Sequence, residues 1–320
     1  MPDPDGAAST SRASDGSATV ATHARGSRLG GWRHRWLPLL VFTIPAIILY
    51  GWFFAAAVGE TVFYSFFQWN AITDPVFIGI QNFVDLVQDP VFVRALVNTA
   101  YMTALLLFVQ LPVALLLAWF LYRKVRGHGF LRTIYFIPVV ISSVAVALLF
   151  SFLYETNFGL INSALRSFGL GGFARNWLGD EATAMTAVTL PLIWTHYGLM
   201  MIILLAAMQG LSKEVLEAAE VDGVNARQRL WHVVLPMIRG AIGVCIILSL
   251  TTALKVFDFV LLLTQGGPAN LTQVTGSYLY EQGYQQFRYG YGSAIATTIM
   301  FIVALAFLLP MFFRARKESR

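Results

Sequence analysis

Six apolar stretches of about 20 or more residues constrain the fold of this chain more than any other feature. A helix of that length crosses a hydrocarbon core of about 30 Å. Helices around a soluble core of this size would carry polar residues at a 3.6-residue period, which these stretches lack. Only 12% of the residues are charged, against about 25% in soluble domains. We therefore predict an all-α integral membrane protein with six transmembrane helices, at residues 37–62, 95–121, 133–153, 183–208, 239–264 and 291–313.

The positions of lysine and arginine predict which side of the membrane each loop occupies, because cytoplasmic loops carry an excess of both. Seventeen of the 22 basic residues lie before span one, between spans two and three, between spans four and five, or after span six. The opposite loops hold four, and Lys255 lies inside span five. Both termini are therefore expected in the cytoplasm. Residues 1–36 would be a disordered tail, 37–313 the membrane domain and 314–320 a second tail.

The same distribution argues against some classes of function. The net charge of +5 does not indicate nucleic-acid binding, because the positive charges flank apolar spans. The sequence contains neither HExxH nor GxSxG, and its histidines are scattered, so an intramembrane enzyme is disfavoured. It also lacks the G-x-x-x-x-G-K-[ST] motif of a phosphate-binding P-loop.

A charged segment, residues 214–236 (EVLEAAEVDGVNARQRLWHVVLP), separates spans four and five. Ser212 is placed to cap a first short helix, and Gly223 to end it in a left-handed conformation. Asn225 can cap a second helix, which Leu235-Pro236 would stop, and Pro236 can open the next segment. The segment is thus predicted to be a small amphipathic helix–turn–helix on the cytoplasmic side. From the residues alone, a docking element for a partner and an ordinary loop on the membrane surface are both open.

The segment resembles the EAA loop of permease subunits in bacterial ATP-binding-cassette importers. The resemblance rests on the spacing from Glu217-Ala218-Ala219 to Gly223 and on to Leu235-Pro236. FIGIQNF at 77–83, NWLGD at 176–180 and LKVFDFVLLLTQGGPANLT at 254–272 are similar to the sugar-importer branch, of the maltose and glycerol-3-phosphate type. A departure is Trp231, where that family is expected to have phenylalanine.

The resemblance implies a transport subunit that is not itself an enzyme. Its coupling helix would dock on a separate ATPase, with Glu217 as a charged contact and Ala218 and Ala219 allowing close approach. The residues implied in ATPase coupling are Glu217, Ala218, Ala219, Asp222, Gly223, Leu235 and Pro236. ATP and magnesium would bind the ATPase dimer. The other implied partners are a second permease as a heterodimer, an extracytoplasmic solute-binding protein, a carbohydrate and the lipid bilayer of the bacterial cytoplasmic membrane.

Polar side chains inside the spans are costly and indicate either a structural pair or a transport path. Lys255 and Asp258 are three residues apart, so on one helix they would share a face and pair, or else line the path. Trp194, Tyr197 and Thr252 suit a sugar, which binds by aromatic stacking and hydrogen bonds. An uncharged di- or oligosaccharide is the favoured substrate.

The alternative function is a secondary transporter driven by a proton gradient. Asp258, Lys255 and His196 would then carry the proton. A packing residue held by hydrogen bonds is the other interpretation of His196, and the favoured one. Such transporters often contain an inverted repeat, and none is visible in the sequence.

Overall fold

The computed structural model describes residues 31–123 and 126–318. They divide into two units, one ending at Ala56 and the other beginning at Ala57. The boundary lies within the first helix, α1 (Gly31–Tyr64), which includes the predicted first span. Of the predicted N-terminal tail, residues 1–30 lie outside the described residues, whereas residues 31–36 form the first turns of α1.

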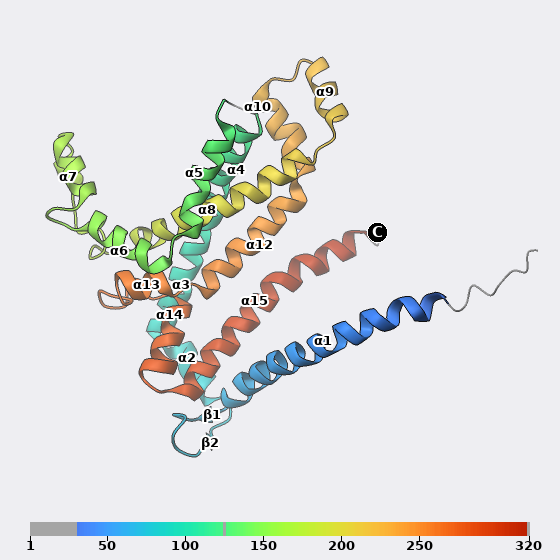
Figure 1. Ribbon diagram of the computed structural model, residues 1–320. Helices are drawn as coiled ribbons and strands as arrows, with labels where there is room; N and C mark the ends of the chain where they lie inside the picture. Colours follow the sequence, from blue (N-terminus) through green and yellow to red (C-terminus); the bar gives the residue numbers. More distant parts are fainter. Residues whose placement is uncertain (1–30, 124–125, 319–320) are drawn as a thin grey trace, which may run out of the picture. The chain divides into compact units, whose positions relative to one another are not determined.

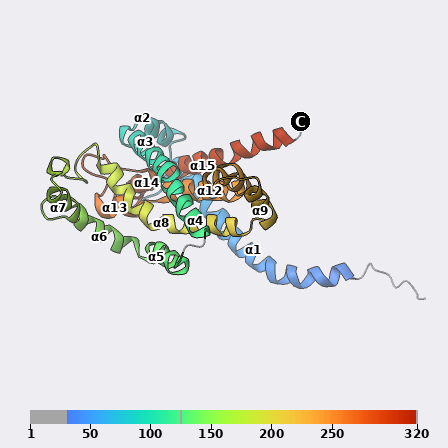
Figure 2. The same cartoon turned by 90° about the horizontal axis from the view of Figure 1, so that it is seen from above.

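Helix α8 (Ala184–Gln209) is the central helix of the second unit. It packs against α4 (Leu111–Tyr122), α5 (His128–Val140) and α12 (Arg239–Lys255). Figure 1 shows α8 passing between α5 and α12, and Figure 2 shows α4 lying against it. Its buried side chains belong to the two largest hydrophobic clusters, among them Leu192, Met201 and Met208. This apolar surface on most sides of α8 explains why its sequence lacks a polar face.

Within the part of the chain that the structure describes, three helical segments are long and apolar enough to cross a membrane: Val41–Tyr64, Pro90–Tyr122 and Ala184–Gln209. The second is built from α3 (Pro90–Leu105), a π-helical turn η1 (Leu106–Gln110) and α4. Two bent pairs of helices bring the number to five if each pair counts as one span. The last helix, α15 (Tyr289–Glu318), has a shorter apolar part, Tyr289–Leu305. It continues through most of the predicted tail 314–320, because Arg, Lys and Glu are good helix formers.

The predicted third span, 133–153, is not one straight helix. It consists of α5 and α6 (Ser143–Tyr154), whose axes differ by 96°. Ile141 between them is extended, and the Ser142 hydroxyl caps α6 by accepting from the Val144 amide at 3.3 Å. A capped helix start after an extended residue cannot continue the axis of the helix before it. The pair Ser142-Ser143 was the local signal for this break.

The described residues contain only two strands, which form a small hairpin between α1 and α3. Strand β1 (Phe67–Gln68) pairs antiparallel with β2 (Val76–Phe77). Helix α2 (Gln81–Gln88) follows it and packs on α15. The stretch before α15 consists of α14 (Thr275–Tyr280) and the π-helical turn η4 (Glu281–Gln285). The hairpin was not predicted from the sequence.

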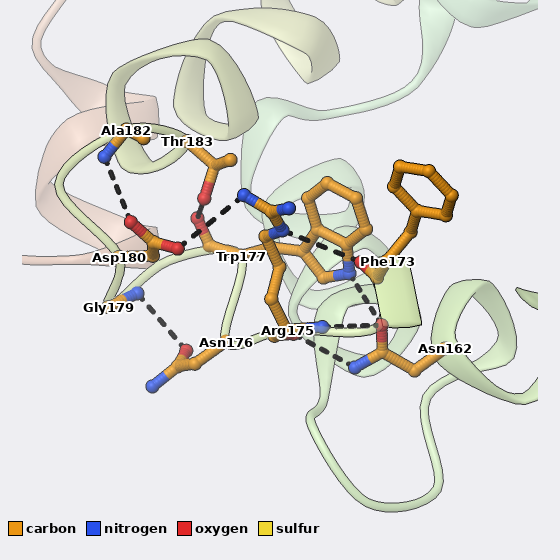
Figure 3. A network of polar contacts seen from close by, with 9 residues as sticks. All are labelled: Asn162, Phe173, Arg175, Asn176, Trp177, Gly179, Asp180, Ala182 and Thr183. Atoms are coloured by element: carbon orange, nitrogen blue, oxygen red, sulfur yellow. Dashed lines mark hydrogen bonds and ion pairs between the residues drawn. The ribbon is translucent and has the colours of Figure 1, made fainter. Parts of the chain in front are cut away.

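The segment between α6 and α8 is held by a polar network centred on Asn162 (Figure 3). It carries α7 (Leu160–Ser167) and the 3-10 turn η2 (Gly171–Phe173). The buried Asn162 carboxamide accepts from the Trp177 indole at 2.9 Å and donates to the Arg175 carbonyl at 2.9 Å. Arg175 also forms an ion pair with Asp180 at 3.7 Å. These contacts give a non-helical stretch a defined path, since few of its backbone groups are satisfied by regular structure.

Asp89 joins three helices at the hairpin end of the second unit. Its carboxylate caps α3 by accepting from the Val91 amide at 2.9 Å, and it accepts from the hydroxyls of Tyr278 and, at 2.7 Å, Tyr291. Burial alone would raise the pKa of Asp89, but these hydrogen bonds outweigh burial and place the pKa below its ordinary value. The network therefore favours the ionised carboxylate.

We expect Asp89→Ala to lower the free energy of unfolding at neutral pH by about 1.5–3 kcal/mol, the range for hydrogen bonds to a charged group. Because the folded-state pKa is depressed, this contribution is complete above the unfolded-state pKa of about 3.9 and is lost as the pH falls through the folded-state value. Thermal unfolding of the chain in lipid nanodiscs at pH 3–7 measures the effect. The difference between wild type and Asp89→Ala should shrink below pH ~4, while Glu181→Ala should match wild type throughout. A difference that does not vary with pH would contradict this role of the carboxylate.

Candidate functional site

Residues 212–238, here called the polar loop, join α8 to α12. The first helix of the loop is α9 (Lys213–Val221). Ser212 directly precedes it, and the Ser212 hydroxyl donates to the Glu214 carboxylate. The predicted cap, which would accept from an amide of the first turn, stays a prediction. Glu214 lies in the first turn, where the helix dipole favours negative charge.

Gly223 ends α9 in the left-handed conformation that the sequence predicts, with φ of 73°. Two backbone hydrogen bonds close the turn: the Asp222 amide donates to the Ala218 carbonyl at 3.0 Å, and the Val224 amide to the Ala219 carbonyl at 3.1 Å. The first is the last regular bond of the helix, and the second is the 6→1 bond of a Schellman motif, in which a residue with positive φ lets the chain satisfy the last carbonyls of the helix. The direction in which the chain leaves α9 therefore depends on Gly223.

The second helix of the polar loop starts at Asn225, again as predicted. The Asn225 carboxamide accepts from the Gln228 amide at 2.9 Å, and the Gln228 side chain accepts from the Asn225 amide at 3.0 Å, which completes a capping box. The helical path then runs through α10 (Ala226–Gln228), the π-helical η3 (Arg229–Val234) and α11 (Leu235–Met237).

The helical path does not stop at Leu235-Pro236 as predicted but continues to Met237, whereas the prediction that Pro236 opens a further segment is confirmed by α11. Pro236 follows a π turn and lies at the start of α11, where a missing amide hydrogen is tolerated. The direction changes by 75° between residues 226–237 and α12, with Ile238 as the joint. Pro236 therefore marks the approach to a bend and not the end of a helix.

One side of the polar loop packs on the helix bundle. Ala219, Leu230 and Val234 are buried, the last two in the cluster shared with α4 and α8. The Arg229 guanidinium lies over the Trp119 ring of α4, 5.7 Å from its centre. Ala218 and Ala219 were predicted to form one small-residue face, but only Ala218 is exposed.

The other side of the polar loop is exposed and carries both charge and apolar surface. Val221 is 88% exposed and Trp231 59% exposed, and Val215 is also exposed. Glu217 and Asp222 lie on the exposed side as well. An aromatic anchor with flanking carboxylates is typical of a protein–protein contact.

A second polar site is a cavity of about 290 Å³ between α8, α12 and α13 (Asp258–Leu263). Four of its lining residues are those singled out in the sequence as path or proton-transfer candidates, and Thr251 adds another hydroxyl. The lining comprises Leu192, His196, Leu248, Thr251, Thr252, Lys255, Val256 and Asp258. Trp194 and Tyr197, also predicted for the path, do not line it. Trp194 instead packs edge-on against Phe150, with ring centres 5.9 Å apart.

Lys255 and Asp258 are not on one helix face. Helix α12 ends at Lys255, Val256 is extended, and Asp258 opens α13. Within the described residues the single ion pair is Arg175–Asp180, so the ion pair between Lys255 and Asp258, one of the two roles predicted for them, is not formed. The chain break turns both charged groups toward one cavity. The i, i+3 spacing predicts a shared helix face only where the helix is unbroken, and here it is broken between the two residues.

His196, predicted from the sequence as either a proton carrier or a hydrogen-bonded packing residue, also lines this cavity. Its Nδ1 lies 2.8 Å from the Thr195 hydroxyl and 3.1 Å from the Leu192 carbonyl, which orients the ring. The cavity thus combines hydroxyls, an imidazole, an amine and a carboxylate within a mainly apolar bundle, as expected of a site for a polar solute.

Residues 110–316 match the protein family described as "Binding-protein-dependent transport system inner membrane component". The chain belongs to this family of permeases. Its membrane-embedded, largely helical architecture and its polar loop are consistent with that membership. The permease is 35% identical over 283 residues to the probable ABC transporter permease YurN of Bacillus subtilis, covering 87% of this chain and 97% of YurN.

Two further similarities extend over most of the permease. MsmF of Streptococcus mutans, a multiple sugar-binding transport system permease, is 31% identical over 271 residues, which cover 84% of this chain and 92% of MsmF. A chain of the bacterial alginate ABC transporter, solved with an alginate pentasaccharide-bound periplasmic protein, is 25% identical with a TM-score of 0.73. That match covers 87% of this chain and 93% of the other.

Proposed function

We propose that this permease forms half of the translocation pore of an ATP-driven, solute-binding-protein-dependent carbohydrate importer in a bacterial cytoplasmic membrane. The observation that carries the proposal is the exposed surface of the polar loop, which presents Trp231 and Val221 as well as carboxylates, on two short helices joined by the turn at Gly223. Family membership and the sugar-transport names of relatives such as MsmF support the assignment.

The proposal includes six membrane spans with both termini in the cytoplasm, which places the polar loop on the ATPase side. A second permease would complete the pore as a heterodimer, and an ATPase dimer would bind ATP and magnesium and receive the polar loop. Glu217, Ala218 and Trp231 would face the ATPase, because they lie exposed. Leu235 and Pro236 would transmit the contact toward α12. A solute-binding protein would deliver the carbohydrate on the opposite side.

Co-purification tests the assembly. The permease, tagged and extracted gently from its native membrane, should bring down an ATPase, a second permease and a solute-binding protein. Radiolabelled sugar uptake into membrane vesicles should then require ATP and the binding protein. Recovery of the permease alone, under conditions that preserve a known importer, would overturn the proposal.

The proton-coupled alternative gains one observation: His196, Lys255 and Asp258, its three required residues, line a single cavity. The same vesicles separate the two functions. A proton uncoupler should leave ATP-driven uptake intact, whereas loss of uptake with uncoupler and persistence without ATP would establish the secondary transporter.

We expect Asp258→Asn to leave assembly normal and to weaken sugar transport about ten- to a hundred-fold in apparent affinity, the equivalent of a lost hydrogen bond to a charged group. The reason is that Asp258 lines the cavity without an ion-pair partner among the described residues. Uptake kinetics and recovery of the complex are the measurements. Glu181→Gln, which removes an exposed carboxylate outside the cavity, should behave as wild type. Loss of the assembled complex with Asp258→Asn would instead show a structural role.

A further inference from the structure

A polar hollow at the hairpin end of the permease, here called the outer hollow, is larger than the cavity between α8, α12 and α13. Its volume is about 500 Å³, within the range of small-molecule binding pockets. It is bounded by the β1–β2 hairpin, α2 and the start of α15, all in the second unit. The residues that matter for its chemistry are Trp69, Asn70, Asp74, Asp85, Phe287 and Arg288.

The walls of this outer hollow are held in place by buried polar contacts. The buried Asn82 carboxamide donates to the carbonyls of Ser65 and Phe67, both at 2.9 Å, which ties α2 to the first strand. The Gly290 amide donates to the Trp69 carbonyl at 3.1 Å, which ties the start of α15 to the same strand. A Cβ on Gly290 would lie 1.9 Å from the Phe67 carbonyl oxygen, so only glycine permits this approach. The hollow is therefore preformed, which lowers the entropic cost of binding a ligand.

The hairpin tip is also rigid. The Asn70 carboxamide accepts from the Ile72 and Thr73 amides at 3.0 and 2.9 Å. The Trp69 indole donates to the Thr73 carbonyl at 2.9 Å, and its ring stacks on Tyr64 with centres 4.3 Å apart. The indole, half-buried at the edge of the hollow, is thus held in one orientation.

The lining combines aromatic rings with hydrogen-bond acceptors. Asp74 and Asp85 are exposed, and Asp74 makes no hydrogen bond or ion pair with any other residue that the structure describes. Asp85 accepts from Gln81 at 2.7 Å. Arg288 is already engaged, donating to the Gln282 side chain at 2.9 Å and lying 4.3 Å from the centre of the Tyr291 ring.

We propose that the outer hollow is a binding subsite for a neutral oligosaccharide of about two or three rings. The proposal rests on the proposed carbohydrate import. Sugar C–H faces stack on aromatic rings such as Trp69 and Phe287, and carboxylates accept hydrogen bonds from sugar hydroxyls. An acidic saccharide such as alginate is disfavoured, because two carboxylates outnumber the one engaged guanidinium and like charges repel. The hollow therefore selects against acidic sugars before they reach the membrane-level cavity.

Saturation-transfer NMR on the assembled importer in lipid nanodiscs, without its binding protein, tests the subsite. The probes are maltotriose, cellotriose and diacetylchitobiose as neutral sugars, and an alginate trimer as the acidic one. Neutral probes should bind, and Trp69→Ala and Asp74→Asn should each weaken binding by about tenfold, as for truncated anchors in buried pockets. Trp69→Phe should retain most of the binding. Glu181→Gln and Val87→Ala, exposed and outside the hollow, should match wild type.

Three outcomes would overturn the subsite: no binding of any neutral probe, equal or tighter binding of the alginate trimer, or binding unchanged in both Trp69→Ala and Asp74→Asn. If Trp69→Ala abolished capture of the solute-binding protein and left sugar binding unchanged, the hollow would be a protein-docking surface instead. Uptake is measured separately. ATP-dependent sugar uptake by the wild type together with an empty hollow would reject the subsite alone, whereas absence of ATP-dependent uptake would reject the proposed function.

Discussion

Replacing Gly223 by valine is expected to reduce uptake to about one-tenth or less while the permease still inserts into the membrane. Gly223 has φ of 73°, and a non-glycine residue in this region costs about 1–2 kcal/mol, more when it is β-branched. No atom lies within 4 Å of the position that a Cβ would occupy, so the penalty is one of backbone conformation and not of collision. Relieving this backbone strain at position 223 would unwind the turn between the two short helices that carry Val221 and Trp231.

The controls for this experiment come from the same region. Gly223→Asn should retain most uptake, because asparagine tolerates the left-handed conformation. Gly240→Val places the same side chain in open space at the start of α12, where φ is not positive, and should behave close to wild type. Uptake assays paired with measurement of ATPase co-purification decide the matter. Wild-type transport by Gly223→Val would exclude the polar loop as the coupling element.

Replacing Gly198 by valine is expected to prevent stable folding of the permease. Gly198 lies at the contact between α8 and α5, where a Cβ would be 2.5 Å from the Tyr135 carbonyl oxygen and 3.0 Å from a methyl group of Val139. Small residues let helix backbones approach closely inside a membrane, and here the obstacle is backbone, which cannot rotate away. Overpacking of this kind costs about 1–3 kcal/mol or more.

The expected result for Gly198→Val is a large loss of monodisperse protein on size-exclusion chromatography and a lower Tm for what remains. Gly198→Ala should give a smaller effect in the same direction. Gly243→Val supplies the matched control on α12, since nothing lies within 4 Å of its Cβ position. A Tm for Gly198→Val equal to that of the control would mean that α5 and α8 are not packed as closely as the structure has them.

The polar loop shows what sequence reasoning does well in this chain. The cap at Asn225 and the turn at Gly223 were predicted because each depends on residues within four positions of one another. The Leu235-Pro236 stop failed because a π turn, invisible in the sequence, accommodates the proline. Local signals were sufficient for local conformations only.

The two cavities show where sequence reasoning ends. Lys255 and Asp258 were recognised as unusual, but their pairing was inferred from a continuous helix that the extended Val256 interrupts. The outer hollow brings Trp69 and Asp74 beside Arg288, more than 200 positions away, and no periodic pattern connects them. Family resemblance supplied the function of the chain, yet only packing shows which polar side chains share a space.

The chain bends at both ends of helix α12, so α12 is a straight segment that connects the polar loop to the cavity. Its 17 residues span about 25 Å at 1.5 Å per residue. At one end the chain turns by 75° at Ile238, where the polar loop meets α12. At the other end the extended Val256 separates Lys255, the last residue of α12, from α13. A tilt of about 10° about Ile238 would move the far end by about 4 Å, for a helix of that length. Such a tilt would change the separation of Lys255 from Asp258 and with it the width of their cavity.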